Sequence, residues 1–292
     1  MVLKEQILIA PMHTRSLMQQ PEAVLEMRGA SKWVVEGVNH SYRAFSDLSL
    51  EVFAGERIGI FAANGFEAKA LLACLSGVEP LDAGTVEHNA SVSWPLGTND
   101  AFLGKLSGYV NARFAAEVYS QPGQIDEDIR LIRELAGVDE SMFHEPLADW
   151  PSALRDSLKL AVSLAFEFDV VMVGRIGGWN HRAIHPHSVR IRQCFEQRIE
   201  GRTLIVCGNG QTDLAIDYCE EGLALVDGKI LYRGDPEVCM EMVKEESKRQ
   251  KERRRERVGK RIAKLVGSDE LDDSESDDSL ESSVSDDILV LR

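Results

Sequence analysis

The segment 57–76, RIGIFAANGFEAKALLACLS, places the strongest constraint on the fold of this 292-residue chain. An apolar strand containing Ile58 and Ile60 leads into a turn of small residues around Asn64 and Gly65, and a helix rich in alanine and leucine follows at once. This order brings the N–H groups of the helix N-terminus to the end of a strand, where they can surround a phosphate. The segment therefore predicts a βα unit with the layout of a phosphate-binding loop.

The residues inside this loop differ from those that bind a nucleotide. The phosphate-binding motif reads G-x-x-x-x-G-K-[ST], in which the glycines admit the backbone, the lysine neutralises the phosphates and the hydroxyl holds Mg²⁺. Aligned without a gap, these four positions fall in order on Ala62, Glu67, Ala68 and Lys69. A shift of one residue makes Lys69 the lysine, but it loses the match at Asn64 and Gly65 and leaves Ala70 without a hydroxyl. In the ungapped alignment, Glu67 would aim a negative charge at a negative ligand.

A second stretch indicates the family. The run SWPLG at residues 93–97 is followed by F-x-G-x-L-x-G at 102–108. These runs, with colinear matches from residue 24 to 235, resemble the nucleotide-binding subunits of ABC transporters, in particular those that export capsular polysaccharide. The resemblance implies an α/β fold: an ABC-type P-loop nucleotide-binding domain with a mostly parallel core sheet, an antiparallel β-subdomain and a helical subdomain.

The resemblance also shows where other catalytic groups of the family would stand. An apolar strand should end in an Asp that holds Mg²⁺ and then a Glu that polarises water; in this chain these two positions hold Gly174 and Arg175. A signature loop should offer Ser and Gly, and here it holds Ser152 and Ala153. A Gln and a switch His should complete the site, but Leu103 stands at the Gln position and Gly208 at the switch His position.

Metal-assisted phosphoryl transfer depends on positioning and charge stabilisation by these groups. The sequence therefore predicts that the chain is not an enzyme but a catalytically inactive ABC ATPase-like subunit, acting by protein–protein interaction as a scaffold or regulator of capsular or surface polysaccharide export. No cofactor and no metal are expected to be required; ATP binding without hydrolysis stays open. Two alternatives are an active but divergent ATPase subunit of such an exporter and an interaction module recruited away from transport.

The resemblance implies partners as well. ABC ATPases pair head to tail around ATP, so we expect a transmembrane transporter subunit, a paralogous ATPase or a second copy of the chain as a partner. No apolar run approaches the roughly 20 residues that span a bilayer, and five separated cysteines suit a reducing compartment. The expected location is the cytoplasm, and a peripheral position on the cytoplasmic face of the inner membrane stays open.

Charge patterning divides the chain. We expect an N-terminal extension over 1–23, the ABC ATPase-like domain over 24–240, a basic helix over 241–266 and an acidic disordered tail over 267–292. Residues 244–264 carry eleven basic side chains against four Glu, and residues 268–292 carry ten acidic side chains against one Arg. The basic helix could meet an anionic membrane surface, hold the acidic tail or simply be solvated.

Nucleic-acid binding is not expected, because the net charge is −15 and aromatic residues are absent among the basic ones.

The pattern of apolar residues predicts the elements themselves. Strands are expected over 24–35, 47–53, 57–62, 86–94, 169–173, 203–207 and within 221–231, and helices over 68–75, 106–119, 126–136, 154–166 and 187–199. Three histidines, His181, His185 and His187, are expected in an exposed loop, with metal binding as the alternative.

Overall fold

A computed structural model of the protein describes residues 23–36, 40–96, 102–177 and 179–266. Most of the expected N-terminal extension and the expected acidic tail lie outside these residues, and so does residue 97 of the diagnostic run. The limits drawn between the domains stay predictions.

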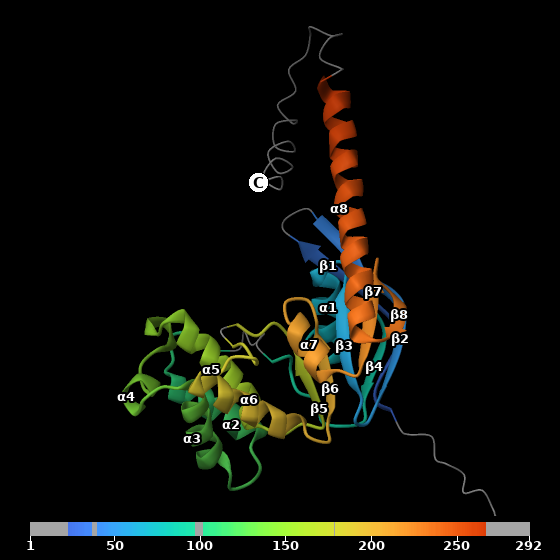
Figure 1. Ribbon diagram of the computed structural model, residues 1–292. Helices are drawn as coiled ribbons and strands as arrows, with labels where there is room; N and C mark the ends of the chain where they lie inside the picture. The colour runs from blue at the N-terminus through green and yellow to red at the C-terminus, as the bar shows by residue number, and fades with distance from the viewer. Residues whose placement is uncertain (1–22, 37–39, 97–101, 178, 267–292) are drawn as a thin grey trace, which may run out of the picture.

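The core is a five-stranded sheet in the order β5-β6-β3-β7-β8. Its first four strands run parallel and β8 pairs antiparallel with β7. The strands are β5 (Val170–Val173), β6 (Thr203–Cys207), β3 (Arg57–Ala62), β7 (Glu221–Val226) and β8 (Lys229–Gly234). Both faces of the central strands are covered, which is why β5 and β6 are apolar throughout rather than alternating. The expected α/β fold with a mostly parallel sheet is confirmed (Figure 1).

Three helices follow core strands: α1 (Gly65–Leu75) after β3, α6 (Pro186–Ile199) after β5 and α7 (Thr212–Tyr218) after β6. Helix α1 packs in one hydrophobic cluster with the core sheet and with the antiparallel sheet. Its N-terminus therefore lies where β3 ends, which is the geometry that residues 57–76 predict.

The antiparallel subdomain has the strand order β2-β1-β4. Its strands are β1 (Ala23–Glu36), β2 (His40–Phe53) and β4 (Ala83–His88). Two predictions were inaccurate here. Strand β2 begins at residue 40 rather than 47, because it pairs with β1 along nearly its whole length, and β4 covers 83–88 rather than 86–94 because its partner β1 meets it there.

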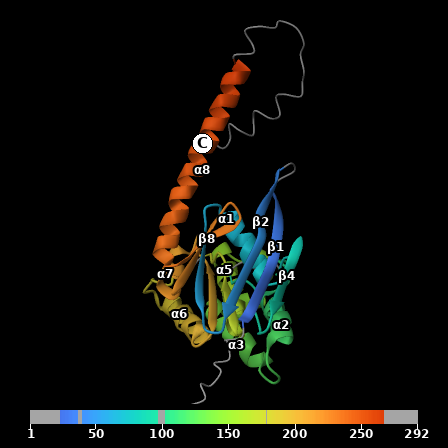
Figure 2. The ribbon, with the colours of Figure 1, turned by 90° about the vertical axis from the view of Figure 1, so that its right-hand side faces the viewer.

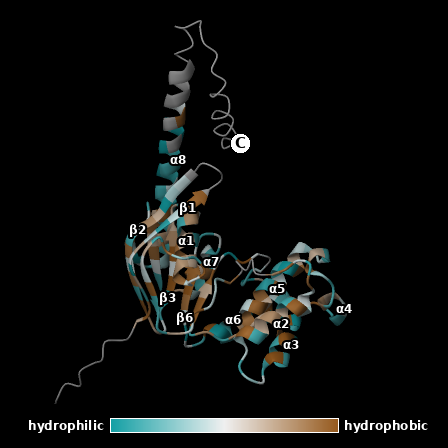
Figure 3. Ribbon diagram, turned by 180° about the vertical axis from the view of Figure 1, so that it is seen from behind, coloured by the Kyte–Doolittle hydropathy of each residue, from teal (hydrophilic) through white to brown (hydrophobic). Residues whose placement is uncertain are grey.

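The helical subdomain stands beside the core sheet (Figure 1). It contains α2 (Gly108–Tyr119), α3 (Ile125–Ala136), the short α4 (Glu140–Phe143), a 3-10 turn (Leu147–Asp149) and α5 (Ser152–Ala165). Helix α3 buries Ile129, Ile132 and Leu135 at helical spacing, and it ends at Gly137, whose φ of 73° is left-handed. Figure 3 shows hydrophobic residues gathered in this subdomain and in the core strands.

Helix α8 (Pro236–Val266) contains the expected basic segment and begins a few residues earlier than its predicted start. The Asp235 carboxylate accepts hydrogen bonds from the N–H groups of Glu237 (2.8 Å) and Val238 (3.1 Å), which caps the helix. The first turns bury Cys239 and Val243, and the helix then leaves the domain (Figure 2). In the described parts of the chain, no helix has the length and apolar character required to cross a membrane.

Candidate functional site

The turn between β3 and α1 forms a closed hydrogen-bonded loop. Asn64 caps α1, because its side-chain oxygen accepts a hydrogen bond from the N–H of Phe66 (3.1 Å) and its backbone oxygen accepts one from the N–H of Glu67 (3.1 Å). The N–H of Ala63 donates to the backbone oxygen of Leu225 in β7 (3.0 Å). These bonds fix the path of the backbone into the helix.

The loop is also held from the end of β6. The side chain of Asn209 accepts a hydrogen bond from the N–H of Ala62 (2.9 Å) and donates one to the oxygen of the same residue (2.9 Å). Reading the sequence did not identify Asn209. The signal was present as an Asn between two glycines directly after an apolar strand, where the carboxyl ends of neighbouring parallel strands meet.

Glu67 does not lie where its position in the motif suggested. Its side chain is only 5% exposed, and the carboxylate accepts a hydrogen bond from the N–H of Gly228 in the β7–β8 turn. The expectation that Glu67 aims its charge at a bound ligand was therefore wrong. Its second carboxylate oxygen has no hydrogen-bond partner among the described residues. Burial raises the pKa of this carboxyl to about 7, and the Gly228 hydrogen bond offsets part of that rise.

The other loop positions divide between the core and the surface. Ala68 and Ala70 are buried, whereas Lys69 is exposed. Phe66 and Lys69 are three residues apart and so lie on the same face of α1. The exposed side of the first two turns therefore carries one aromatic ring and one ammonium group.

An aromatic pair adjoins this exposed face. The rings of Tyr42, on β2, and Phe66 meet edge to face, with their centroids 6.4 Å apart, and Phe66 is 49% exposed. Rings of this kind offer a stacking surface to a purine. Phe66 was not singled out from the sequence, because only the fold brings β2 against the start of α1.

Gly208, the position predicted for the switch histidine, is a glycine that packing requires. A Cβ at this position would lie 2.6 Å from the ring of Phe61, a buried residue of β3. The neighbouring Cys207 is buried, and burial raises the pKa of its thiol to about 11, so it is an inert core residue.

The loop after β5 reaches the same edge of the sheet. Gly174 is buried and Arg175 is exposed. The side chain of Gln211 donates a hydrogen bond to the oxygen of Ile176 (2.9 Å), and a Cβ on Gly210 would lie 3.8 Å from Cγ of Arg175. The loop after β6 thus connects the loop after β5 with the turn that begins α1.

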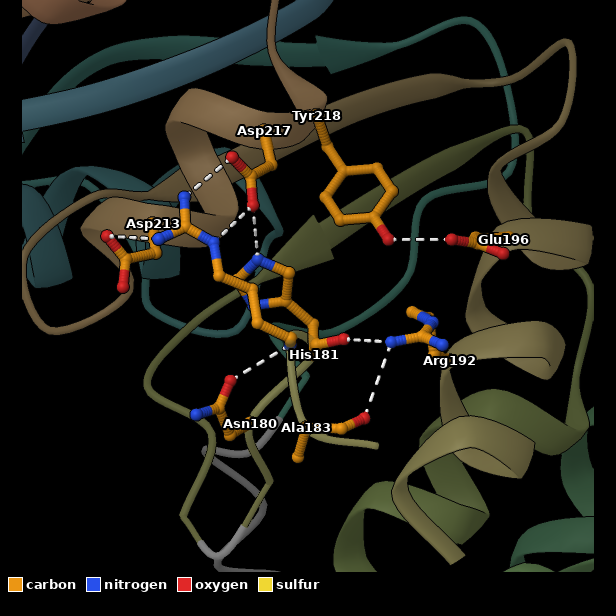
Figure 4. Close-up of polar contacts among 9 residues, drawn as sticks. Asn180, His181, Ala183, Arg192, Glu196, Asp213, Asp217 and Tyr218 are labelled. Carbon is orange, nitrogen blue, oxygen red and sulfur yellow. Dashed lines mark hydrogen bonds and ion pairs between the residues drawn. The ribbon is translucent and has the colours of Figure 1, made fainter. Parts of the chain in front are cut away.

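A polar network anchors the remainder of the β5–α6 loop (Figure 4). Nε2 of His181 lies 2.7 Å from Asp217, and Arg182 makes two bonds of 2.7 Å to the same carboxylate. The hydrogen bond from Arg182 is the main cause that lowers the pKa of the Asp217 carboxyl to about 2, and the contact with His181 adds to it. Arg192 also donates to the oxygen of His181 (2.7 Å). The expectation of an exposed histidine loop was wrong for His181, which is only 7% exposed.

Two of the predicted sites lie elsewhere in the chain. Ser152 and Ala153 are exposed at the N-terminus of α5 in the helical subdomain, which Figure 1 shows apart from α1. Leu103 precedes α2 and is 61% exposed. The structure thus brings together the loop of 62–70, the Gly174–Arg175 segment and Gly208, and leaves the signature-loop and Leu103 positions separate.

The residues around the loop do not fit a Mg²⁺ ion. An ion at this place takes a hydroxyl from the loop and a carboxylate from the end of the second strand. The chain offers Lys69 at the first of these positions and Gly174 at the second, with Arg175 next to it. Across the described ranges, no group of three or more His, Cys, Asp or Glu side chains is arranged to hold a metal ion.

Several known ATP-binding proteins are similar to this chain. It is 30% identical over 185 residues to the ATP-binding protein BexA of Haemophilus influenzae, a match that covers 62% of this chain and 81% of BexA. The capsule polysaccharide export ATP-binding protein CtrD of Neisseria meningitidis serogroup B is 28% identical, over 67% of this chain and 87% of CtrD. The polysialic acid transport ATP-binding protein KpsT of Escherichia coli is 24% identical, over 68% and 89%. No protein-family model matches the chain.

Solved structures agree on the fold. The ATP-binding cassette MJ0796, in a dimeric structure bound to ADP and Pi, superposes with a TM-score of 0.56 at 13% identity, covering 73% of this chain and 98% of the cassette. A second structure, an ATP-binding subunit of an ABC transporter, has the same TM-score at 14% identity and is covered to 90% of its length. At this identity the likeness shows the fold alone.

The similar proteins overturn one prediction. The chain was expected not to be an enzyme, on the ground that its catalytic positions are altered. Its relatives are ATP-binding proteins of ABC type, a class of ATPases, and nothing in the comparison sets this chain apart as inactive. Altered residues at the motif positions were too weak a ground for that prediction, because they do not test whether the chain binds or hydrolyses ATP. The chain belongs to the family of ABC-transporter ATP-binding proteins that act in capsule polysaccharide export.

Proposed function

We propose that this chain is the ATP-binding subunit of an exporter of capsular or related surface polysaccharide, and that ATP binds on the exposed side of the loop between β3 and α1. The relatives named for polysialic acid transport and capsule polysaccharide export support the transport system. The match covers 81–89% of the lengths of these relatives, so it involves most of each protein.

The observation that carries the proposal is the aromatic pair at the start of α1. Tyr42 and Phe66 provide a partly exposed stacking surface directly beside the helix N-terminus. A purine on this pair leaves the attached phosphates near the positive end of the helix dipole, around Asn64 and Gly65. The loop therefore offers one place for the base and one for the phosphates.

The transmembrane subunit is the proposed partner, and α2 is its proposed docking surface. Val110, Phe114 and Val118 are 42%, 68% and 57% exposed and lie four residues apart, so they form one apolar stripe along the helix. Leu103 and Leu106, in the segment before the helix, are also exposed. An exposed apolar stripe of this length is typical of a surface that another protein covers.

Calorimetric titration of the purified chain with ATP tests the binding site. We expect saturable binding that Phe66→Ala weakens by about 5- to 150-fold, since stacking of one base on one aromatic ring is worth about 1–3 kcal/mol. Phe114→Ala is the control, because it removes an exposed phenylalanine from the α2 stripe, away from the loop, and should leave the affinity unchanged. Absence of heat up to millimolar ATP would overturn the proposal.

Co-purification with the transmembrane subunit tests the docking surface. Val118→Ser should weaken the complex, whereas Val78→Ser should not, although the two valines are similarly exposed at 57% and 60%. Equal recovery of the complex with both variants would remove α2 from the interface.

A further inference from the structure

Two cationic side chains stand where the phosphate-loop architecture carries groups that bind or adjoin Mg²⁺. Lys69 replaces the hydroxyl residue of the loop, and Arg175 stands, after Gly174, where the water-polarising glutamate would follow β5. One magnesium ligand and the neighbouring carboxylate are thus replaced by groups that repel a cation and attract a phosphate, and the aspartate position holds Gly174, which has no side chain to bind a metal.

The two cations belong to one cluster of loops. Asn209 holds Ala62 through two hydrogen bonds of 2.9 Å, and a Cβ on Gly65 would lie 3.8 Å from the Asn209 side chain. The next residue, Gly210, lies against the side chain of Arg175. Arg175 is therefore connected, through two successive residues of a single loop, to the first turn of the helix that carries Lys69.

Both side chains are available to a ligand. Each is exposed, and neither takes part in an ion pair with another described residue. This sets Arg175 apart from Arg182 in the same loop, whose guanidinium is committed to Asp217. Together the two free cations carry the same formal charge of about +2 that a magnesium ion supplies.

We propose that this chain binds nucleoside triphosphate without a divalent cation, with Lys69 and Arg175 taking the place of Mg²⁺ against the phosphate oxygens. The inference rests on the proposed ATP site. A guanidinium binds phosphate with two parallel hydrogen bonds, and an ammonium acts as a compact point charge, so the pair suits a phosphate chain that carries no metal. A magnesium ion bound to the same phosphates would face two positive charges.

Titration with ATP in excess EDTA and, separately, in excess Mg²⁺ tests the inference. Metal-free ATP should bind at least as tightly as the magnesium complex. Binding in Mg²⁺ alone would overturn the inference and leave the proposed ATP site standing. No binding under either condition would overturn the proposed site itself, so the two failures are distinguishable.

A substitution that returns a carboxylate to the end of β5 sharpens the test. Arg175→Asp should weaken binding in EDTA at least tenfold, and added Mg²⁺ should recover it, because a carboxylate then stands at the end of β5. Lys105→Asp is the control, since Lys105 is an exposed lysine before α2 and its loss should change neither titration. Thermal melting of both variants establishes that they fold. If folded Arg175→Asp binds ATP in EDTA as the unaltered chain does, the inference is wrong.

Discussion

The buried carboxyl of Glu67 should make the stability of the protein depend on pH. The folded state holds the proton of this group with a pKa of about 7, against 4.5 for an ordinary glutamate. Each tenfold difference in proton affinity is worth about 1.4 kcal/mol, so ionising Glu67 in the folded chain costs roughly 3 kcal/mol in full. Because the folded pKa is the higher one, this stability is present below pH 4.5 and is lost as pH rises to about 7.

The assay is urea unfolding of the unaltered chain and of Glu67→Gln at pH 5.5 and pH 8. Glutamine keeps an oxygen for the Gly228 N–H and cannot ionise. Between these pH values the free energy of unfolding of the unaltered chain should fall by about 2 kcal/mol relative to the variant. Glu252→Gln, on the exposed surface of α8, is the control and should show no such difference. A gap between Glu67→Gln and the unaltered chain that stays constant from pH 5.5 to pH 8 would refute the reasoning, whatever its size.

Two further substitutions test the loop clamp and the basic helix. Asn209→Ala leaves the N–H and oxygen of Ala62 without partners, so it should lower the free energy of unfolding in urea by about 1–3 kcal/mol. Asn89→Ala removes a single exposed hydrogen bond and should lower it by less than about 1 kcal/mol. Equal losses in the two variants would contradict the clamp. If α8 meets an anionic membrane surface, Lys248→Glu should reduce sedimentation with phosphatidylserine vesicles by about fivefold or more, because each basic residue near the surface contributes about 1 kcal/mol. Lys229→Glu, which lies outside α8, should not reduce it. Equal sedimentation of the unaltered chain and both variants would exclude the helix as the contact.

The parts of the fold that local sequence determines were predicted well. The β3–α1 unit, the all-apolar strands β5 and β6 and the amphipathic α3 each carry their pattern within a dozen residues, and the structure has them at the expected places. Short α7 was missed, because seven residues give too few turns for a helical period to be recognised.

The features that the sequence did not reveal depend on contacts between distant residues. Glu67 reads as an exposed residue of a first helical turn, yet the β7–β8 turn, which the chain reaches some 160 residues later, covers it. His181 is buried for the same reason, since its partner Asp217 comes from α7. The start of β2 at residue 40 follows from its pairing with β1 rather than from its own polar residues. In each case the local pattern is ambiguous, and the tertiary contact decides the outcome.

The site shows the same division. The sequence identified the loop, and its position at the end of β3 is as expected. The residues that now argue for ligand binding, Phe66 beside Tyr42 and Arg175 beside the Asn209 loop, come from different elements. From the sequence, Arg175 was judged only against its motif position, and Phe66 was not singled out. A comparison with the motif detects side chains that are missing from the motif positions. It does not detect side chains that other elements of the fold bring to the same place.

A crystal structure of the chain with ATP, grown in excess EDTA, tests the central claim most directly. The account predicts density for a purine against Tyr42 and Phe66, with the triphosphate running past the N-terminus of α1 between Lys69 and Arg175. Density for ATP at any other surface, or none at ATP concentrations of several millimolar, would contradict it.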